Sequence, residues 1–129
     1  MESTRLFIIE PDGDLGEAAA EGLNELGFAV HIEMDPQKGL ERLFDLRTPR
    51  PHVIFLDAPP FVDVEWFFDA VRGHQRTAEI PIIVTVGTAS VSAEVVRRSA
   101  HCLWKPYTLH ALTEATELVL RGVASQTPI

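Results

Sequence analysis

Short apolar segments alternate with amphipathic helical segments along this chain, and this alternation constrains the fold more than any other feature. Residues 6–9 form a continuous apolar run, which predicts a strand buried on both faces. The polar residues 10–13 follow it as a loop. From Leu15 the apolar residues recur on one helical face, and Gly27 is placed to end that helix.

The same pattern predicts four more strands and four more helices. Further strands are expected at 28–33, 53–56, 80–86 and 102–104. A second helix opens at Pro36, the fourth covers 90–98 and the fifth covers 109–121. The third helix buries Val64, Phe67, Phe68 and Val71, a spacing that turns Trp66 away from the core.

Strands that alternate with helices through loops of two to six residues require right-handed crossovers. The predicted fold class is therefore α/β, a single doubly wound parallel sheet of five strands with five helices covering both faces. One domain is expected over residues 1–122. Residues 123–129 are expected to form a C-terminal tail or the start of a linker.

Composition and net charge disfavour several classes of function for this chain. A chain of 129 residues is long enough for one domain with a real core, and its single cysteine, Cys102, fits a reducing compartment. The net charge of -8 disfavours binding of nucleic acid or anionic lipid by this chain alone. No apolar run approaches the length of a membrane span, and no signal-peptide pattern is seen, so a cytoplasmic location is expected.

Charged residues follow several of the predicted strands. Glu10 and Asp12 come after the first strand, Asp57 after the third and Lys105 after the fifth. Because the carboxyl ends of parallel strands meet at one edge of a sheet, we expect these side chains to converge. Carboxylates can bind a hard divalent cation or attack phosphorus, and an ammonium group can neutralise phosphoryl oxygens.

In order and spacing, four segments resemble the receiver domain of two-component response regulators, from Arg5 to about Leu120. The first, 6–15, is similar to that family's first strand and acidic turn. Residues 53–57 resemble the strand that carries the phosphoacceptor aspartate, and 80–84 resemble the fourth strand. The last segment, 103–107, resembles the Lys-Pro-aromatic signature, in which the Lys-Pro bond is commonly cis.

The resemblance implies a flavodoxin-like sheet with strand order 2-1-3-4-5 and a role in phosphorelay signalling. Asp57 would accept a phosphoryl group from a histidine kinase, and Lys105 would contact that group. Mg2+ would be held by Glu10, Asp12, Asp57 and the backbone carbonyl of Pro59, which proline retains.

Departures from the family pattern indicate an atypical member. Pro11 stands where the family has its second, metal-binding acid, so Mg2+ would be bound weakly or not at all. Val86 and Cys102 occupy the positions of the switch hydroxyl and the switch aromatic. Thr85 alternates to the face opposite Val86, and Thr88 could help only if its loop bends back. The expected output is therefore a protein contact, either dimerisation or docking to another signalling protein.

Other readings remain open. Asp12 could replace the missing acid, giving a conventional receiver phosphorylated on Asp57. Lys105 could instead neutralise Glu10 and Asp57 as a purely structural ion cluster.

An enzyme is not expected, because a phosphatase using an aspartyl phosphate would need an acid where Pro59 stands. A flavin carrier would need a glycine- and hydroxyl-rich loop at 10–14.

Overall fold

The computed structural model describes residues 2–87 and 91–122. A five-stranded sheet with strand order β2-β1-β3-β4-β5 forms its centre, and every neighbouring pair is parallel. This confirms the predicted class and order of strands. The elements in chain order are β1 (Arg5–Ile9), α1 (Gly13–Glu25), β2 (Ala29–Glu33), α2 (Pro36–Phe44), β3 (Val53–Ala58), α3 (Glu65–Arg72), β4 (Ile82–Val86), α4 (Ala93–Arg98), β5 (His101–Trp104) and α5 (Leu109–Leu120).

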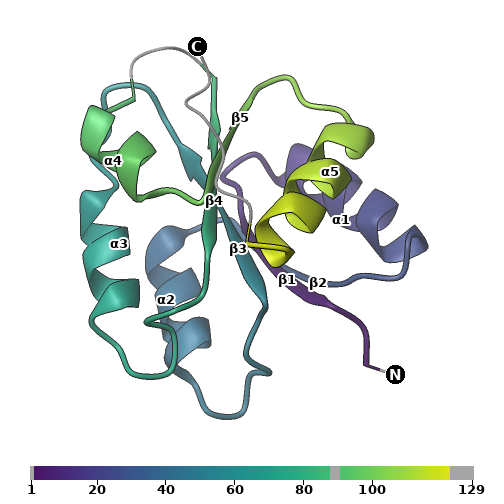
Figure 1. Cartoon of the computed structure of the whole chain (residues 1–129), viewed down its shortest axis with the longest axis horizontal. Coiled ribbons are helices and arrows are strands. Elements are labelled where there is room, and N and C mark those ends of the chain that lie inside the picture. The colour runs from purple at the N-terminus through teal and green to yellow at the C-terminus, as the bar shows by residue number, and fades with distance from the viewer. Residues whose placement is uncertain (1, 88–90, 123–129) are drawn as a thin grey trace.

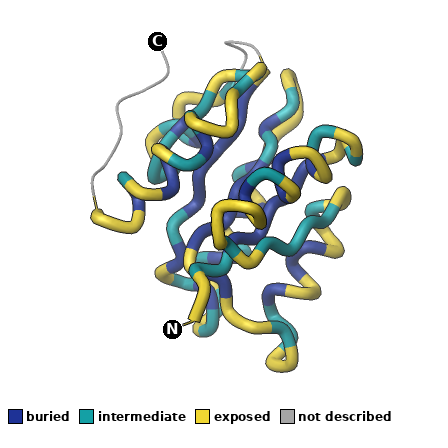
Figure 2. Tube along the Cα trace, turned by 90° about the vertical axis from the view of Figure 1, so that its right-hand side faces the viewer, coloured by how far each residue is buried: buried dark blue, intermediate teal, exposed yellow. Residues whose placement is uncertain are grey.

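Helices cover both faces of the sheet. Figure 1 shows α2, α3 and α4 on one side and α1 and α5 on the other. Buried residues follow the central strands, and the outward surfaces of the helices are exposed (Figure 2). Since successive side chains of a strand point to opposite faces, each central strand contributes to two separate cores, one under each layer of helices.

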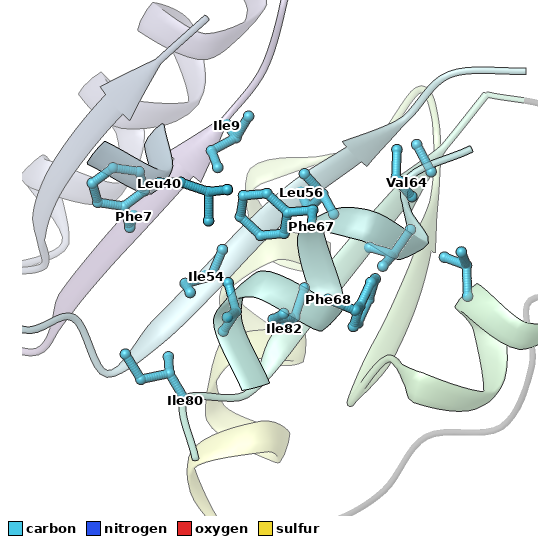
Figure 3. Packing of buried hydrophobic residues seen from close by; sticks show 14 of the residues in the cluster. Phe7, Ile9, Leu40, Ile54, Leu56, Val64, Phe67, Phe68, Ile80 and Ile82 are labelled. Atoms are coloured by element: carbon cyan, nitrogen blue, oxygen red, sulfur yellow. The ribbon is translucent and has the colours of Figure 1, made fainter. Parts of the chain in front are cut away.

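The larger core lies between the sheet and α2, α3 and α4. Phe67, Phe68 and Val71 are fully buried in it, and Val64 just before α3 is almost so (Figure 3). Trp66 is 40% exposed, as the helical spacing predicted. The smaller core, under α1 and α5, contains side chains of both helices and the alternate residues of the strands.

Side chains mark the starts of most helices in the described part of the chain. Asp12, Asp35, Ser92 and Thr108 each accept a hydrogen bond from a backbone N–H of the first turn of α1, α2, α4 and α5. At the other end of α1, Gly27 has a φ of 98°, a conformation that favours glycine. These local signals explain why the sequence pattern located the helices well.

Some boundaries differ from the prediction. The strand β4 begins at Ile82 instead of residue 80, because Pro81 has no N–H for the ladder. The strand β3 continues to Ala58, so Asp57 lies inside it. The helix α4 begins at Ala93. Its predicted start at residue 90, Thr88 and the predicted tail 123–129 lie outside the described residues.

No helix in the two described stretches has the length and apolar character needed to cross a lipid bilayer.

Candidate functional site

Lys105 joins two carboxylates at the carboxyl edge of the sheet. Its Nζ lies 2.7 Å from Oε1 of Glu10 and 2.6 Å from Oδ1 of Asp57. The side chains of Glu10 and Asp57 are only 4% and 10% exposed, and that of Lys105 is 21% exposed. We call these three residues the ion cluster. The structure thus brings together three of the residues that the sequence placed at strand ends.

Backbone pairing at the strand ends fixes the ion cluster. The N–H of Glu10 donates to the carbonyl of Glu33, which continues the pairing of β1 with β2 by one residue. Similarly, the N–H of Lys105 donates to the carbonyl of Val86, next to β5. The Lys105–Pro106 peptide bond is cis, as the resemblance implied. Each charged side chain therefore projects from backbone that the sheet holds in place.

Asp12 does not join the ion cluster. Its Oδ1 accepts a hydrogen bond from the N–H of Leu15 at 3.2 Å, so this carboxylate caps α1. Its own N–H donates to Oε2 of Glu10 at 3.1 Å. Both oxygens of Glu10 are consequently engaged, one by Lys105 and the other by this turn.

Each residue proposed as a donor for Mg2+ makes at least one other contact within the chain. The carbonyl of Pro59 accepts a hydrogen bond from the N–H of Val62 at 3.3 Å and so closes a turn. Pro11 offers no ligand side chain, and within residues 2–87 and 91–122 no three His, Cys, Asp or Glu side chains are grouped to hold a metal. Mg2+ requires a near-octahedral shell of oxygens. In this arrangement the ion cluster does not fit that ion.

The charge of Lys105 is stabilised by its partners. Desolvation by burial acts to lower its pKa, but the hydrogen bonds to Asp57 and Glu10 and their negative charges outweigh it. The net effect is a pKa raised above the usual 10.5. The ammonium is therefore fully charged at neutral pH, and it acts as a resident cation between two carboxylates.

Tyr107 lies close enough to the ion cluster to respond to its charges. Burial is the main reason that its pKa rises from 10.0 to about 12, and the negative charge of Glu10 adds to the rise. Tyr107 is the only tyrosine of the chain, so its ionisation can be followed without interference.

We expect the tyrosinate absorbance of the folded protein to appear with a midpoint of about 12, against 10.0 in urea. Because the folded state keeps a proton that the unfolded chain loses, this group makes stability fall as the pH rises above 10.0. Spectrophotometric titration with circular dichroism at each pH measures both effects. A folded protein titrating at the same midpoint as in urea would contradict this placement of Tyr107.

The two positions expected for the switch residues lie in an apolar environment. Val86 is fully buried and Cys102 is 7% exposed, and both belong to the core under α3 and α4 together with Val95 of α4. The Sγ of Cys102 lies 3.2 Å from Oγ of Ser99. Burial raises the pKa of the Cys102 thiol, which keeps it neutral at physiological pH. These residues therefore serve to hold α4 on the sheet.

Sequence reasoning missed the position of Thr85. Its side chain lies on the face opposite Val86, as alternation required, but this is the face of Asp57. Thr85 is the register partner of Asp57 in the β3–β4 pair and is only 4% exposed. The residue of β4 that brings a hydroxyl beside Asp57 is thus Thr85. Only the pairing of β3 with β4 reveals it.

Comparison with solved structures identifies the fold. A response regulator from Desulfuromonas acetoxidans is 17% identical, with 92% of this chain and 98% of that chain covered and a TM-score of 0.74. The chemotaxis protein CheY4 of Vibrio cholerae is 19% identical, with 91% and 98% covered and a TM-score of 0.76. An orphan response regulator of H. pylori is 22% identical, with 92% and 98% covered and a TM-score of 0.72.

These similarities show that the chain has the fold of response regulator receiver domains. They extend over nearly the whole length of both chains in each pair. No family model matches the sequence, and no curated protein matches it. At these identities the fold is shared, and the chemistry of the site has to be argued from this chain's own residues.

Proposed function

We propose that this chain is a receiver-type signalling module in which Mg2+-dependent phosphorylation of Asp57 is weakened or lost, and which acts through protein contacts. It would work in phosphorelay signalling as a binding partner, without enzymatic activity of its own. The observation that carries the proposal is the ion cluster, in which Lys105 pairs with both carboxylates.

The charge of the ion cluster disfavours phosphoryl transfer. Two carboxylates and one ammonium give a net charge of about -1, and phosphorylation would replace the single charge of Asp57 by a phosphate charge of about -1.5 to -2. A divalent cation would compensate this repulsion, but Pro11 supplies no ligand and Asp12 caps α1. The attacking oxygen of Asp57 would also have to give up part of its pairing with Lys105.

The environment of Val86 and Cys102 also supports the proposal. Val86, at the position expected for the switch hydroxyl, carries none, and the hydroxyl of β4 on the face of Asp57 belongs to the buried Thr85. Val86 and Cys102 instead belong to the core that also contains Val95 of α4, on the face of the sheet opposite Asp57. A module of this kind would signal by being bound, either by a histidine kinase, by another signalling protein or by a second copy.

The decisive experiment is incubation with Mg2+ and acetyl phosphate, followed by intact mass measurement. We expect little or no adduct on the unaltered protein, because neither the metal nor the incoming charge is accommodated. The variant Pro11→Asp supplies the missing acid on an exposed turn, and it is expected to gain Mg2+ binding in a calorimetric titration.

The variant Asp57→Asn serves as the control for any adduct that forms. A stoichiometric adduct on the unaltered protein that disappears in Asp57→Asn would establish the conventional receiver and refute the weakened chemistry. Measurable Mg2+ binding to the unaltered protein would refute the claim that its metal site is weakened or lost. If Pro11→Asp also fails to bind Mg2+, the engagement of Glu10 by Lys105 is the remaining cause, which the variant Lys105→Met would then relieve.

A further inference from the structure

A pocket of about 230 Å³ opens at the amino edge of the sheet, at the opposite end of the strands from the ion cluster. The first residues of β1 and β2 line it on one side, and the loop between α2 and β3, at the bottom of Figure 1, lines it on the other. Most of the lining is apolar and includes Phe7, Pro49 and Pro51, whereas Arg5 and His31 supply charged or polar groups. A mainly apolar pocket with a few polar groups is typical of a small-molecule site.

The α2–β3 loop is attached to the rest of the protein on two sides. A terminal nitrogen of the Arg76 guanidinium donates a hydrogen bond to the carbonyl of Thr48, and Nε of Arg50 donates to the carbonyl of Arg76 at 2.7 Å. At the end of the loop the N–H of His52 donates to the carbonyl of Arg5 at 2.8 Å. The pocket is therefore formed before any ligand arrives, which lowers the cost of binding.

Three guanidinium groups gather beside this pocket. Nε of Arg5 donates to the carbonyl of Arg50 at 2.7 Å, so Arg5, Arg50 and Arg76 are linked in series through backbone carbonyls, and we call them the arginine cluster. Carbonyls are neutral and leave the positive charges uncompensated. Among the described residues, Arg50 and Arg76 take part in no ion pair. Arg5 pairs only with Glu2, which lies 3.4 Å away and is 90% exposed.

We propose that the pocket and the arginine cluster together bind a nucleoside phosphate. Guanidinium groups pair with phosphate oxygens through two parallel hydrogen bonds. A carboxylate carries a single charge and needs one such partner, whereas a phosphate monoester carries about -1.5 to -2 and matches several. The planar base would lie in the apolar pocket beside His31, whose ring already stacks on that of Phe7 with centroids 4.8 Å apart.

The size of the pocket determines how such a ligand would be divided. Its volume of about 230 Å³ lies below the range of about 300–1,000 Å³ that holds a whole drug-sized ligand. The base would therefore fill it, and the sugar and phosphate would remain at the mouth, next to the arginine cluster. The inference goes beyond the proposed function and does not depend on whether Asp57 is phosphorylated, because the two sites lie at opposite edges of the sheet.

The test is calorimetric titration of the full chain with the 5′-monophosphates of adenosine, guanosine, cytidine and uridine. The four nucleosides and inorganic phosphate are titrated separately. We expect at least one monophosphate to bind at least about tenfold more tightly than its nucleoside and than inorganic phosphate. In 15N-labelled protein, its binding is expected to shift amide signals at the starts of β1 and β2 and over residues 48–52.

Substitutions in the arginine cluster test the assignment of the charge. Arg5→Gln with Arg50→Gln removes two guanidinium groups and is expected to weaken binding by about tenfold. The matched control, Arg97→Gln with Arg121→Gln, makes the same change of net charge at exposed positions on α4 and after α5. It is expected to weaken binding by less than about twofold.

The variant Glu2→Gln tests the same charge in the opposite direction. It removes the one carboxylate that pairs with Arg5, at an exposed position where folding is not at stake. Binding is expected to strengthen by about twofold. Unchanged or weaker binding in Glu2→Gln would contradict the role of Arg5.

The proposal is overturned if none of the four monophosphates binds, or if inorganic phosphate binds as tightly as they do, because the pocket would then contribute nothing. A control variant that loses as much affinity as Arg5→Gln with Arg50→Gln would also overturn it. Amide shifts confined to Glu10, Asp57 and Lys105 would place the phosphate at the ion cluster instead. The acetyl phosphate experiment tests Asp57 separately, so the two proposals fail independently.

Discussion

Replacing Lys105 by methionine is expected to lower the free energy of unfolding at pH 7 by about 3 kcal/mol. The substitution leaves Glu10 and Asp57 buried and negatively charged without the ammonium that lies within 2.7 Å of both. The Lys105 side chain is 21% exposed, which puts the loss at the low end of the range for breaking a buried ion pair. Urea-induced unfolding followed by circular dichroism measures it.

The pH dependence of this stabilisation follows from the pKa of Lys105. The pKa is raised in the folded state, so the contribution is fully present below pH 10.5 and is lost as the pH rises through the folded value. The variant Glu10→Gln in the Lys105→Met background removes one of the two unpaired charges. This double variant is expected to be more stable than Lys105→Met alone. An unchanged urea midpoint in Lys105→Met would contradict the role assigned to the ion cluster.

The substitution Phe67→Ala is expected to cost about 4 kcal/mol of unfolding free energy. Phe67 is fully buried between α3 and the sheet (Figure 3), so its loss removes apolar burial and leaves a cavity. The Trp66 ring meets that of Phe67 edge to face, with centroids 6.0 Å apart, so tryptophan fluorescence should report the change locally. Urea unfolding gives the free energy.

Phe61→Ala is the matched control, because the same atoms are deleted at a position that is 91% exposed. Its effect is expected to stay within about 0.5 kcal/mol. Similar losses of unfolding free energy in Phe67→Ala and Phe61→Ala would contradict the packing of α3 against the sheet. A large loss in Phe67→Ala alone would support the packing that holds β3, and with it Asp57, in position.

The ion cluster shows how the rim of this sheet is stabilised by residues of the chain itself. Two carboxylates at a strand edge destabilise a fold unless a cation compensates them. Here a lysine of the same chain supplies that cation at 2.6 and 2.7 Å. Lys105 therefore compensates the two buried carboxylates from within the chain.

Much of the fold followed from local sequence patterns. The periodicity of apolar residues and the capping residues located the helices and strands, because both signals act within a few positions of the chain. Pro36, for example, begins α2, and Asp35 caps it. The convergence of Glu10, Asp57 and Lys105 could likewise be foreseen, since the carboxyl ends of parallel strands share one edge.

What each side chain does at that edge was decided by tertiary pairing. The sequence offered Asp12 as a metal ligand, but the turn into α1 uses its carboxylate as a cap. Thr85 lies on the face of Asp57 because β4 pairs with β3 in one particular register, which alternation within β4 cannot specify. The sequence by itself determined the elements and the residues available for chemistry. Contacts between distant segments determined which of them meet, because register and side-chain partnership depend on how the strands and helices pack together.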